Sequence, residues 1–189
     1  MGPNVHRLTV VLLSFTACSG GETTVYDPAV ATPPAVPAAR FSPAMAFDAA
    51  SGDTILFGGQ TVNAFFADTW AWNGQRWRQL RPQHSPSARS SAEMAYDPVR
   101  GRIVLFGGVG PERANPTDTW LWDGADWSRA VAAFAPPGTW SEGMAFFPAT
   151  GSVVLYHGGS AFSSVPAQLF SWNGQRWIAL PVPGGPPPA

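Results

Sequence analysis

Between residues 40 and 180, short apolar and polar runs follow one another in the same order three times. The first run of each unit alternates small residues with a methionine and an aromatic residue (44–48, 93–97 and 143–147). The second is continuously apolar and ends in paired glycines (54–59, 103–108 and 153–159). The third has an aromatic residue at alternate positions (68–72, 118–122 and 168–172), and the fourth begins with a lone tryptophan (Trp77, Trp127 and Trp177). Because short runs with period two are typical of β-strands, each unit is predicted to form four strands.

Glycine-containing dipeptides separate these runs and indicate turns. Asn-Gly or Asp-Gly stands between the third and fourth runs (73–74, 123–124 and 173–174), and Ser-Gly, Arg-Gly or Thr-Gly stands between the first two. Asn-Gly and Asp-Gly tolerate positive φ at both central positions of a type I′ hairpin turn. Asp48 and Asp97 precede turns, so we expect their carboxylates to accept hydrogen bonds from nearby backbone N–H groups. No segment has a sustained helical period, and the repeated block is predicted to be all-β.

The alternation within the third run predicts how the sheets pack. Trp70 and Trp72 point to one face of their strand, whereas Thr69 and Ala71 point to the other. Large rings of one sheet are therefore expected to meet small residues of its neighbour. Eight of the nine tryptophans occupy repeat positions, which makes sheet packing their expected role. This is the arrangement of four-stranded blades stacked around an axis.

Several strings resemble a known family. Met-Ala-Tyr-Asp (94–97), Leu-Phe-Gly-Gly (105–108) and Asp-Thr-Trp-Leu-Trp-Asp-Gly (118–124) are similar to the repeats of bacterial kelch-type β-propellers, the repeat class that also builds the propeller of galactose oxidase. Trp120 lies 50 residues after Trp70 and 50 before Phe170, a spacing within the range of structural repeats. The resemblance implies three four-stranded antiparallel kelch blades, at residues 40–81, 82–130 and 131–181. The third copy departs from the pattern and is expected to be less regular, at Thr139, Phe147, His157 and Gln168.

Three blades form a partial or open propeller. The resemblance implies about six or seven blades in a complete ring, so two blade faces are left uncovered here. Large uncovered apolar faces mark interfaces. Three explanations stay open: the chain is part of a longer one, a second copy completes the ring, or the three blades persist as an open arc.

The amino-terminal residues predict export. Residues 1–18 have an arginine before a short apolar run, and they end in Thr-Ala-Cys, which resembles a bacterial lipobox. Cys18 is the only cysteine and the expected lipid attachment site; an ordinary secretory signal is the alternative. Residues 19–39 are predicted to be a Pro/Ala-rich tether, and residues 182–189 a loose Pro/Gly tail. We expect an outer-membrane or cell-surface lipoprotein that meets the membrane only through Cys18, or otherwise a periplasmic or secreted protein.

Composition excludes one class of partner. The 189 residues are 45% hydrophobic and 13% aromatic, which suits a packed protein. Charged residues make up only 12%, and the formal net charge is −1. Such a chain lacks the excess of positive charge that attracts nucleic acid.

Binding residues are predicted on the long loops that share one edge of the blades, since loops on a rigid scaffold often carry function. For the phenylalanines on these loops, Phe65, Phe66 and Phe162, the alternative is that they cover blade edges. Arg40 and Arg89 enter the innermost strands from the same side and would meet an anionic ligand at a channel mouth. Pairing with Asp68 and Asp118 is favoured, because the arginine recurs in register. The predicted loop contacts are Phe65, Phe66, Glu112, Arg113 and Phe162.

Catalytic residues are not predicted. His84 and His157 have no carboxylate or histidine at metal-ligand spacing, so neither a metal nor another cofactor is expected. The copper site of galactose oxidase uses a cysteine-linked tyrosine and two histidines, and Cys18 lies outside the blades. The predicted function is therefore a non-enzymatic, exported module that binds a protein or glycan. The alternative is a metal-free carbohydrate-modifying enzyme that resembles the kelch-type sialic-acid mutarotase.

Overall fold

The computed structural model describes residues 35–138, 142–158 and 167–181. Within these ranges the protein is all-β, and its twelve strands form three four-stranded antiparallel sheets, as predicted. The expectations for residues 1–34 and 182–189, and those for Cys18, Thr139 and Phe162, fall outside the described residues.

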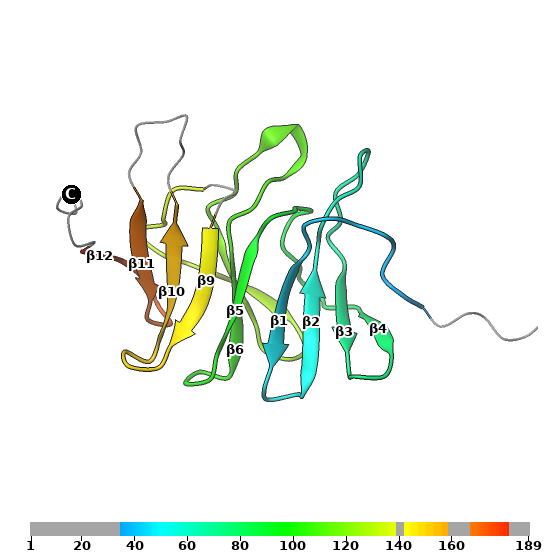
Figure 1. Cartoon of the computed structure of the whole chain (residues 1–189), viewed down its shortest axis with the longest axis horizontal. Coiled ribbons are helices and arrows are strands. Elements are labelled where there is room, and N and C mark those ends of the chain that lie inside the picture. The colour runs from blue at the N-terminus through cyan, green and yellow to red at the C-terminus, as the bar shows by residue number, and fades with distance from the viewer. Residues whose placement is uncertain (1–34, 139–141, 159–166, 182–189) are drawn as a thin grey trace, which may run out of the picture. The chain divides into compact units, whose positions relative to one another are not determined.

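Each sheet is built from four consecutive strands that pair with their chain neighbours (Figure 1). The only helical segment of the described residues is the single 3-10 turn η1 (Pro111–Arg113). The strands of blade 1 are β1 (Ala44–Asp48), β2 (Asp53–Phe57), β3 (Thr69–Trp72) and β4 (Trp77–Leu80). Those of blade 2 are β5 (Glu93–Asp97), β6 (Arg102–Phe106), β7 (Thr119–Trp122) and β8 (Trp127–Ala130). Those of blade 3 are β9 (Glu142–Phe147), β10 (Ser152–His157), β11 (Gln168–Trp172) and β12 (Trp177–Leu180).

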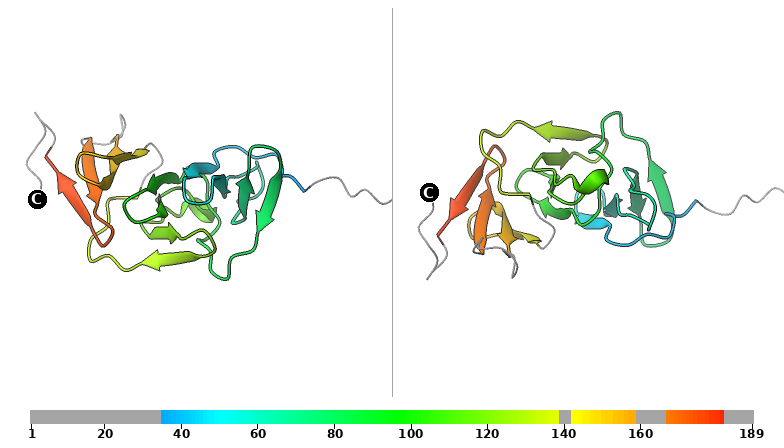
Figure 2. Two further views of the ribbon diagram at one scale, coloured as in Figure 1. Left: turned by 90° about the horizontal axis from the view of Figure 1, so that it is seen from below. Right: turned by 90° about the horizontal axis from the view of Figure 1, so that it is seen from above.

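The first strands of the three blades, β1, β5 and β9, lie side by side in one row. The last strands, β4, β8 and β12, fan outward from this row (Figure 2). The row does not close on itself, so one face of blade 1 and one face of blade 3 have no neighbouring sheet among the described residues. The architecture is a set of stacked blades that does not form a ring.

The turns lie where the glycine dipeptides predicted them, but the predicted type I′ geometry is wrong. Gly74 has φ of 89°, whereas Asn73 does not have positive φ. Four residues separate Trp72 from its partner Trp77, and the Asn73 side-chain oxygen accepts the backbone N–H groups of Gln75 (3.0 Å) and Arg76 (2.9 Å). The asparagine is thus used as a side-chain acceptor within a longer loop, a role that its short amide supports equally well.

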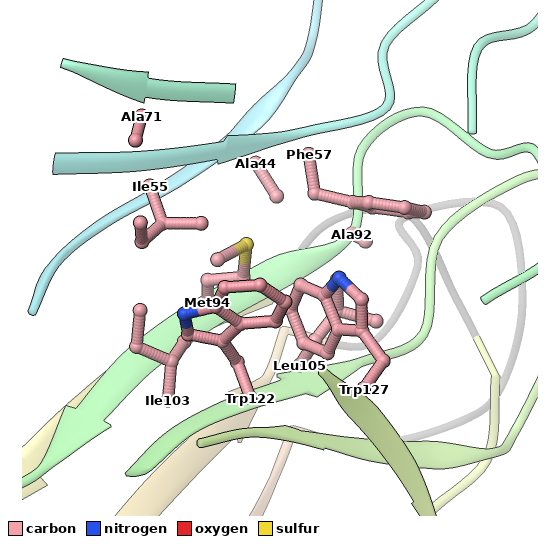
Figure 3. Close-up of a cluster of buried hydrophobic side chains, with 10 residues drawn as sticks. All are labelled: Ala44, Ile55, Phe57, Ala71, Ala92, Met94, Ile103, Leu105, Trp122 and Trp127. Carbon is pink, nitrogen blue, oxygen red and sulfur yellow. The ribbon is translucent and has the colours of Figure 1, made fainter. Parts of the chain in front are cut away.

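Large rings of one blade pack on small residues of the next, which confirms the predicted use of the strand faces. Blade 1 contributes Ala44 and Ala71 to the first buried cluster, and blade 2 contributes Met94, Trp122 and Trp127 (Figure 3). Both tryptophans are about 1% exposed. Each burial contributes at most about 5 kcal/mol, taking roughly 200 Å² at about 25 cal/mol per Å².

The second cluster repeats this arrangement one blade further along. Ala95, Val104 and Phe106 of blade 2 are buried against Trp172 and Trp177 of blade 3. Successive blades therefore stack in the same direction, with the tryptophan face of each blade on the small-residue face of the blade before it.

Blade 3 keeps the strand order of the other two, and its departures are local. His157 adds one residue to β10 and stands opposite Glu142 and Gln168. Asp48 and Asp97 are buried and accept backbone hydrogen bonds in their turns, as predicted, whereas their counterpart Phe147 is 50% exposed. Phe147 offers no side-chain acceptor, and the β9–β10 turn has backbone hydrogen bonds to the Phe147 and Pro148 carbonyls.

Candidate functional site

The long connections and the tight turns lie at opposite ends of the strands. The β2–β3 connection (58–68) and the β6–β7 connection (107–118) project from one edge of the blades, and the short turns project from the other (Figure 1). The backbone fixes the stems of the long loops: Phe41 is bridged to Gln60, and Ser90 to Val109. This loop-bearing edge is where the sequence predicted ligand contacts.

Glu112 and Arg113 form the tip of the β6–β7 connection, and both side chains are exposed. Two backbone hydrogen bonds close the loop below them. Gly110 N–H donates to the Ala114 carbonyl (2.7 Å), and Ala114 N–H donates to the Pro111 carbonyl (3.1 Å). Glu112 and Arg113 have φ of 56° and 58°, in the left-handed region. That region costs a non-glycine residue roughly 1–2 kcal/mol, and such conformations concentrate at functional sites.

Phe65 and Phe66 take a different position from the charged tip, because both are partly buried. The Arg40 guanidinium lies 4.1 Å from the centre of the Phe66 ring. The Phe66 backbone accepts from Arg89 N–H (3.1 Å) and donates to the Gly59 carbonyl (2.9 Å), which ties blade 1 to the start of blade 2. These contacts place Phe66 in the junction between blades 1 and 2.

Arg40 and Arg89 are held by carboxylates of their own blades. Arg89 is fully buried and donates from Nη1 and Nη2 to Asp118 (2.7 and 3.2 Å), and it also donates to Gly107 O, Ser87 O and Ser87 Oγ. These bonds use all five guanidinium donors. The Arg40 side chain is 4% exposed and forms the equivalent pair with Asp68 (2.5 and 2.9 Å). Arg89 thus has neither exposed surface nor a spare donor for an anionic ligand.

Both aspartates of these pairs have pKa values below the usual range. Burial alone would raise the pKa of Asp68 and of Asp118. Hydrogen bonds from the arginine, and from the indole N–H two residues on (Trp70 or Trp120, 2.6 and 2.7 Å), outweigh that effect and lower the pKa. The carboxylates remain charged, so each ion pair fastens the end of a long loop to the segment that leads into the first strand of its blade.

A second polar cluster lies between blades 1 and 2, and the sequence analysis did not predict it. His84, in the β4–β5 connection, donates its backbone N–H to Asp126 (2.8 Å), and its Nδ1 lies 2.8 Å from the same carboxylate. The His84 N–H is the main reason that the pKa of Asp126 is lowered, followed by its side chain. An open hollow of about 430 Å³ adjoins the pair, lined by His84, Trp120, Asp123, Asp126, Trp127, Ser128 and Arg129.

This cluster could not be predicted from spacing, because 42 residues separate His84 from Asp126. Asp126 also occupies a variable position of the repeat, where the other two copies have Arg76 and Arg176. The cluster forms where the β7–β8 turn of blade 2 meets the connection that leaves blade 1. The counterparts in the next blade, Phe134 and Arg176, cannot make the same pair.

Two further features are absent from the residues that the structure describes. No group of three or more histidine, cysteine, aspartate or glutamate side chains there is placed to hold a metal ion. No helix among those residues is long and apolar enough to cross a membrane. In comparisons with known proteins, no family model and no curated protein matched the chain.

Proposed function

We propose that this protein is an exported, non-enzymatic binding module made of kelch-type β-propeller blades. It presents its loop-bearing edge to a protein or glycan. The observation that carries this proposal is the tip of the β6–β7 connection, where Glu112 and Arg113 are exposed in left-handed backbone conformations. A loop that keeps two charged residues strained and solvent-exposed on a rigid sheet is suited to recognition, because the strain is offset by the scaffold.

The surrounding charges support the same location. Two ion pairs anchor the loops, one between Arg40 and Asp68 and the other between Arg89 and Asp118. Glu112 and Arg113, by contrast, present a carboxylate and a guanidinium to solvent. Such a pair can hydrogen-bond to sugar hydroxyls or to charged side chains of a protein.

Export and anchoring are proposed from the sequence of residues 1–18, with Cys18 as the lipid attachment site. Acyl chains contribute about 0.8 kcal/mol per buried CH₂, so a multiply acylated cysteine holds a protein firmly at a membrane. Detergent partitioning tests this proposal: wild type is expected in the detergent phase and Cys18→Ser in the aqueous phase. If both partition alike, lipid attachment at Cys18 is wrong.

The binding proposal is tested with the purified full chain on a glycan array and in a pull-down from a detergent extract of the cell envelope. Retention of a defined glycan or protein, reduced at least about tenfold by Glu112→Ala/Arg113→Ala, is the expected result. Undiminished retention by that variant would remove the loop tip from the binding site.

A second candidate is a metal-free carbohydrate-modifying enzyme of the kelch mutarotase type. The hollow beside His84 and Asp126 favours it, because a histidine–carboxylate pair, Arg129 and the ring of Trp120 line one depression. Aromatic faces and carboxylates suit a sugar, and a histidine beside a carboxylate suits proton transfer. Interconversion of sugar anomers that disappears in His84→Ala, with the melting temperature retained, would favour this candidate over the binding module.

A further inference from the structure

The uncovered face of blade 1 is the tryptophan face that the other two blades bury. Met45 and Phe47 are 47% and 57% exposed, whereas Met94, the counterpart of Met45 in blade 2, is 7% exposed. Trp77 is only partly buried, whereas its counterparts Trp127 and Trp177 are almost completely buried. Blade 1 therefore carries a packing surface with no sheet against it among the described residues.

The uncovered face of blade 3 is the opposite, small-residue face, and it is hollowed. The hollow has a volume of about 600 Å³, and glycine and apolar side chains make up almost all of its lining. Tyr156 on this face is 48% exposed, whereas its counterparts Phe57 and Phe106 are almost completely buried by the next blade. Residues that line the hollow include Gly143, Ala145, Val154, Tyr156, Leu169 and Leu180.

The interfaces between blades 1 and 2 and between blades 2 and 3 show which side chains pack on a small-residue face. Met94 shares a buried cluster with Ala44 and Ile55 of the preceding blade, and the partly buried Ala46 packs against this cluster. One blade further along, Met144 packs against the cluster that contains Ala95 and Val104. In both interfaces a methionine of the first strand meets alanine and a β-branched residue. The corresponding residues of the hollow are Gly143, Ala145 and Val154.

We propose that blade 1 of a second copy of this chain docks in the hollow on blade 3, with Met45 beside Gly143, Ala145 and Val154. The uncovered face of blade 1 and the hollowed face of blade 3 belong to the same chain, and both expose apolar side chains. Met45 on one face and Gly143, Ala145 and Val154 on the other correspond in register to residues of the two interfaces already packed within the chain. Each copy carries one of each face, so two copies make two equivalent contacts when the pair closes.

Position 169 makes the contact between two copies weaker than the blade interfaces within one chain. Trp127 donates its indole N–H to Thr69 Oγ1 (3.0 Å), and Trp177 donates to Thr119 Oγ1 (2.8 Å). The third blade has Leu169 at that position, so Trp77 of a second copy finds no hydroxyl there. A hydrogen bond is missing in an otherwise matching interface, and the association is expected to be reversible and concentration-dependent.

Light scattering of the full chain over a range of concentrations tests the docking. Wild type is expected to pass from one copy to two, and Met45→Glu and Ala145→Glu are each expected to raise the dissociation constant at least about tenfold. Val131→Glu, at a 98% exposed position away from both faces, is the matched control and leaves the constant unchanged. A folded wild type that stays single at every concentration overturns the proposal. Disruption by Ala145→Glu alone overturns it too, because it would mean that blade 3 pairs with blade 3.

Leu169→Thr probes the contact between Trp77 and position 169 directly. The change is made in wild type and in a Trp77→Phe background, and the two effects on the dissociation constant are compared. Because phenylalanine offers no donor to the new hydroxyl, Leu169→Thr is expected to lower the dissociation constant about fivefold more with Trp77 present. Equal effects in the two backgrounds would show that Trp77 does not reach position 169 of a second copy.

Discussion

Trp122 and Trp127 pack against each other with ring centres 5.3 Å apart, yet their indole N–H groups have different environments. Trp127 N–H donates to Thr69 Oγ1 across the blade interface (3.0 Å), whereas Trp122 N–H is buried with no hydrogen-bond partner in the described part of the chain. The two rings have the same burial and lie in the same cluster (Figure 3). Substitutions of these two tryptophans can therefore distinguish the stability contributed by the hydrogen bond from that contributed by apolar packing.

Phenylalanine substitutions measure that difference. Trp127→Phe removes ring volume and also leaves the Thr69 hydroxyl without its donor, whereas Trp122→Phe removes volume and eliminates an unpaired N–H. We expect Trp127→Phe to lower the free energy of unfolding by about 1–3 kcal/mol more than Trp122→Phe does. Urea denaturation of both variants provides the comparison, and equal losses would mean that the Trp127–Thr69 hydrogen bond does not stabilise the interface.

Low pH is expected to weaken the ion pairs that hold the long loops. The pKa values of Asp68 and Asp118 are lowered from 3.8, so these groups stabilise the fold above their unfolded-state pKa. This stabilisation is lost as the pH falls through the lower, folded-state pKa. We expect the free energy of unfolding to decrease between about pH 5 and about pH 2, and less steeply in Asp68→Asn/Asp118→Asn.

A residual slope is expected in that double variant, because the pKa of Asp123 is lowered by backbone N–H donors and that of Asp126 mainly by His84. Denaturation curves at a series of pH values give both slopes. Identical slopes in wild type and variant would contradict the assignment of this acid sensitivity to the arginine pairs.

Glycine at the loop tip is expected to stabilise the protein. Glu112 and Arg113 have positive φ, which glycine adopts without a steric cost. Glu112→Gly and Arg113→Gly should each raise the free energy of unfolding by about 0.5–1 kcal/mol. Val62→Gly, at an exposed position of the β2–β3 connection without positive φ, is the control and should lower it slightly. Thermal unfolding of the three variants checks the signs, and a loss of stability at the tip would argue against backbone strain.

Asp97 is expected to be essential for the β5–β6 turn. It is buried, its Oδ1 accepts from Val99 N–H (3.0 Å) and Arg100 N–H (3.2 Å), and its Oδ2 accepts from the Arg100 guanidinium (2.7 Å). Asp97→Ala should lower the free energy of unfolding by about 1–3 kcal/mol, because these donors lose their acceptor. Asp97→Asn keeps one oxygen acceptor and should cost less. If Asp97→Ala is as stable as wild type, the turn does not depend on this side chain.

Strand positions and blade faces could be predicted because their signals are local. Period-two alternation places Trp70 and Trp72 on one face, and glycine marks the turns whatever the neighbouring blade does. The turn type could not be predicted, because Asn73 acts through its side chain in a four-residue loop whose length depends on the pairing of Trp72 with Trp77.

The candidate functional site also contains residues that the sequence could predict and residues that it could not. The pairing of Arg89 with Asp118 follows from their recurrence in register, and the structure adds that Arg89 is buried. The strained backbone of Arg113 and the contact between His84 and Asp126 depend on how loops and blades meet in three dimensions, so no sequence pattern indicates them.

The central claim is that tryptophans hold the blades together while the loop tip binds the ligand. Its most direct test compares the amount of ligand retained from a cell-envelope extract by three full-length proteins. These are wild type, Glu112→Ala/Arg113→Ala at the loop tip, and Gln75→Ala/Arg76→Ala at the tight turn on the opposite edge. We predict at least about a tenfold loss for the loop-tip variant and wild-type retention for the tight-turn variant. Equal retention by all three, or loss only in the tight-turn variant, would contradict the claim.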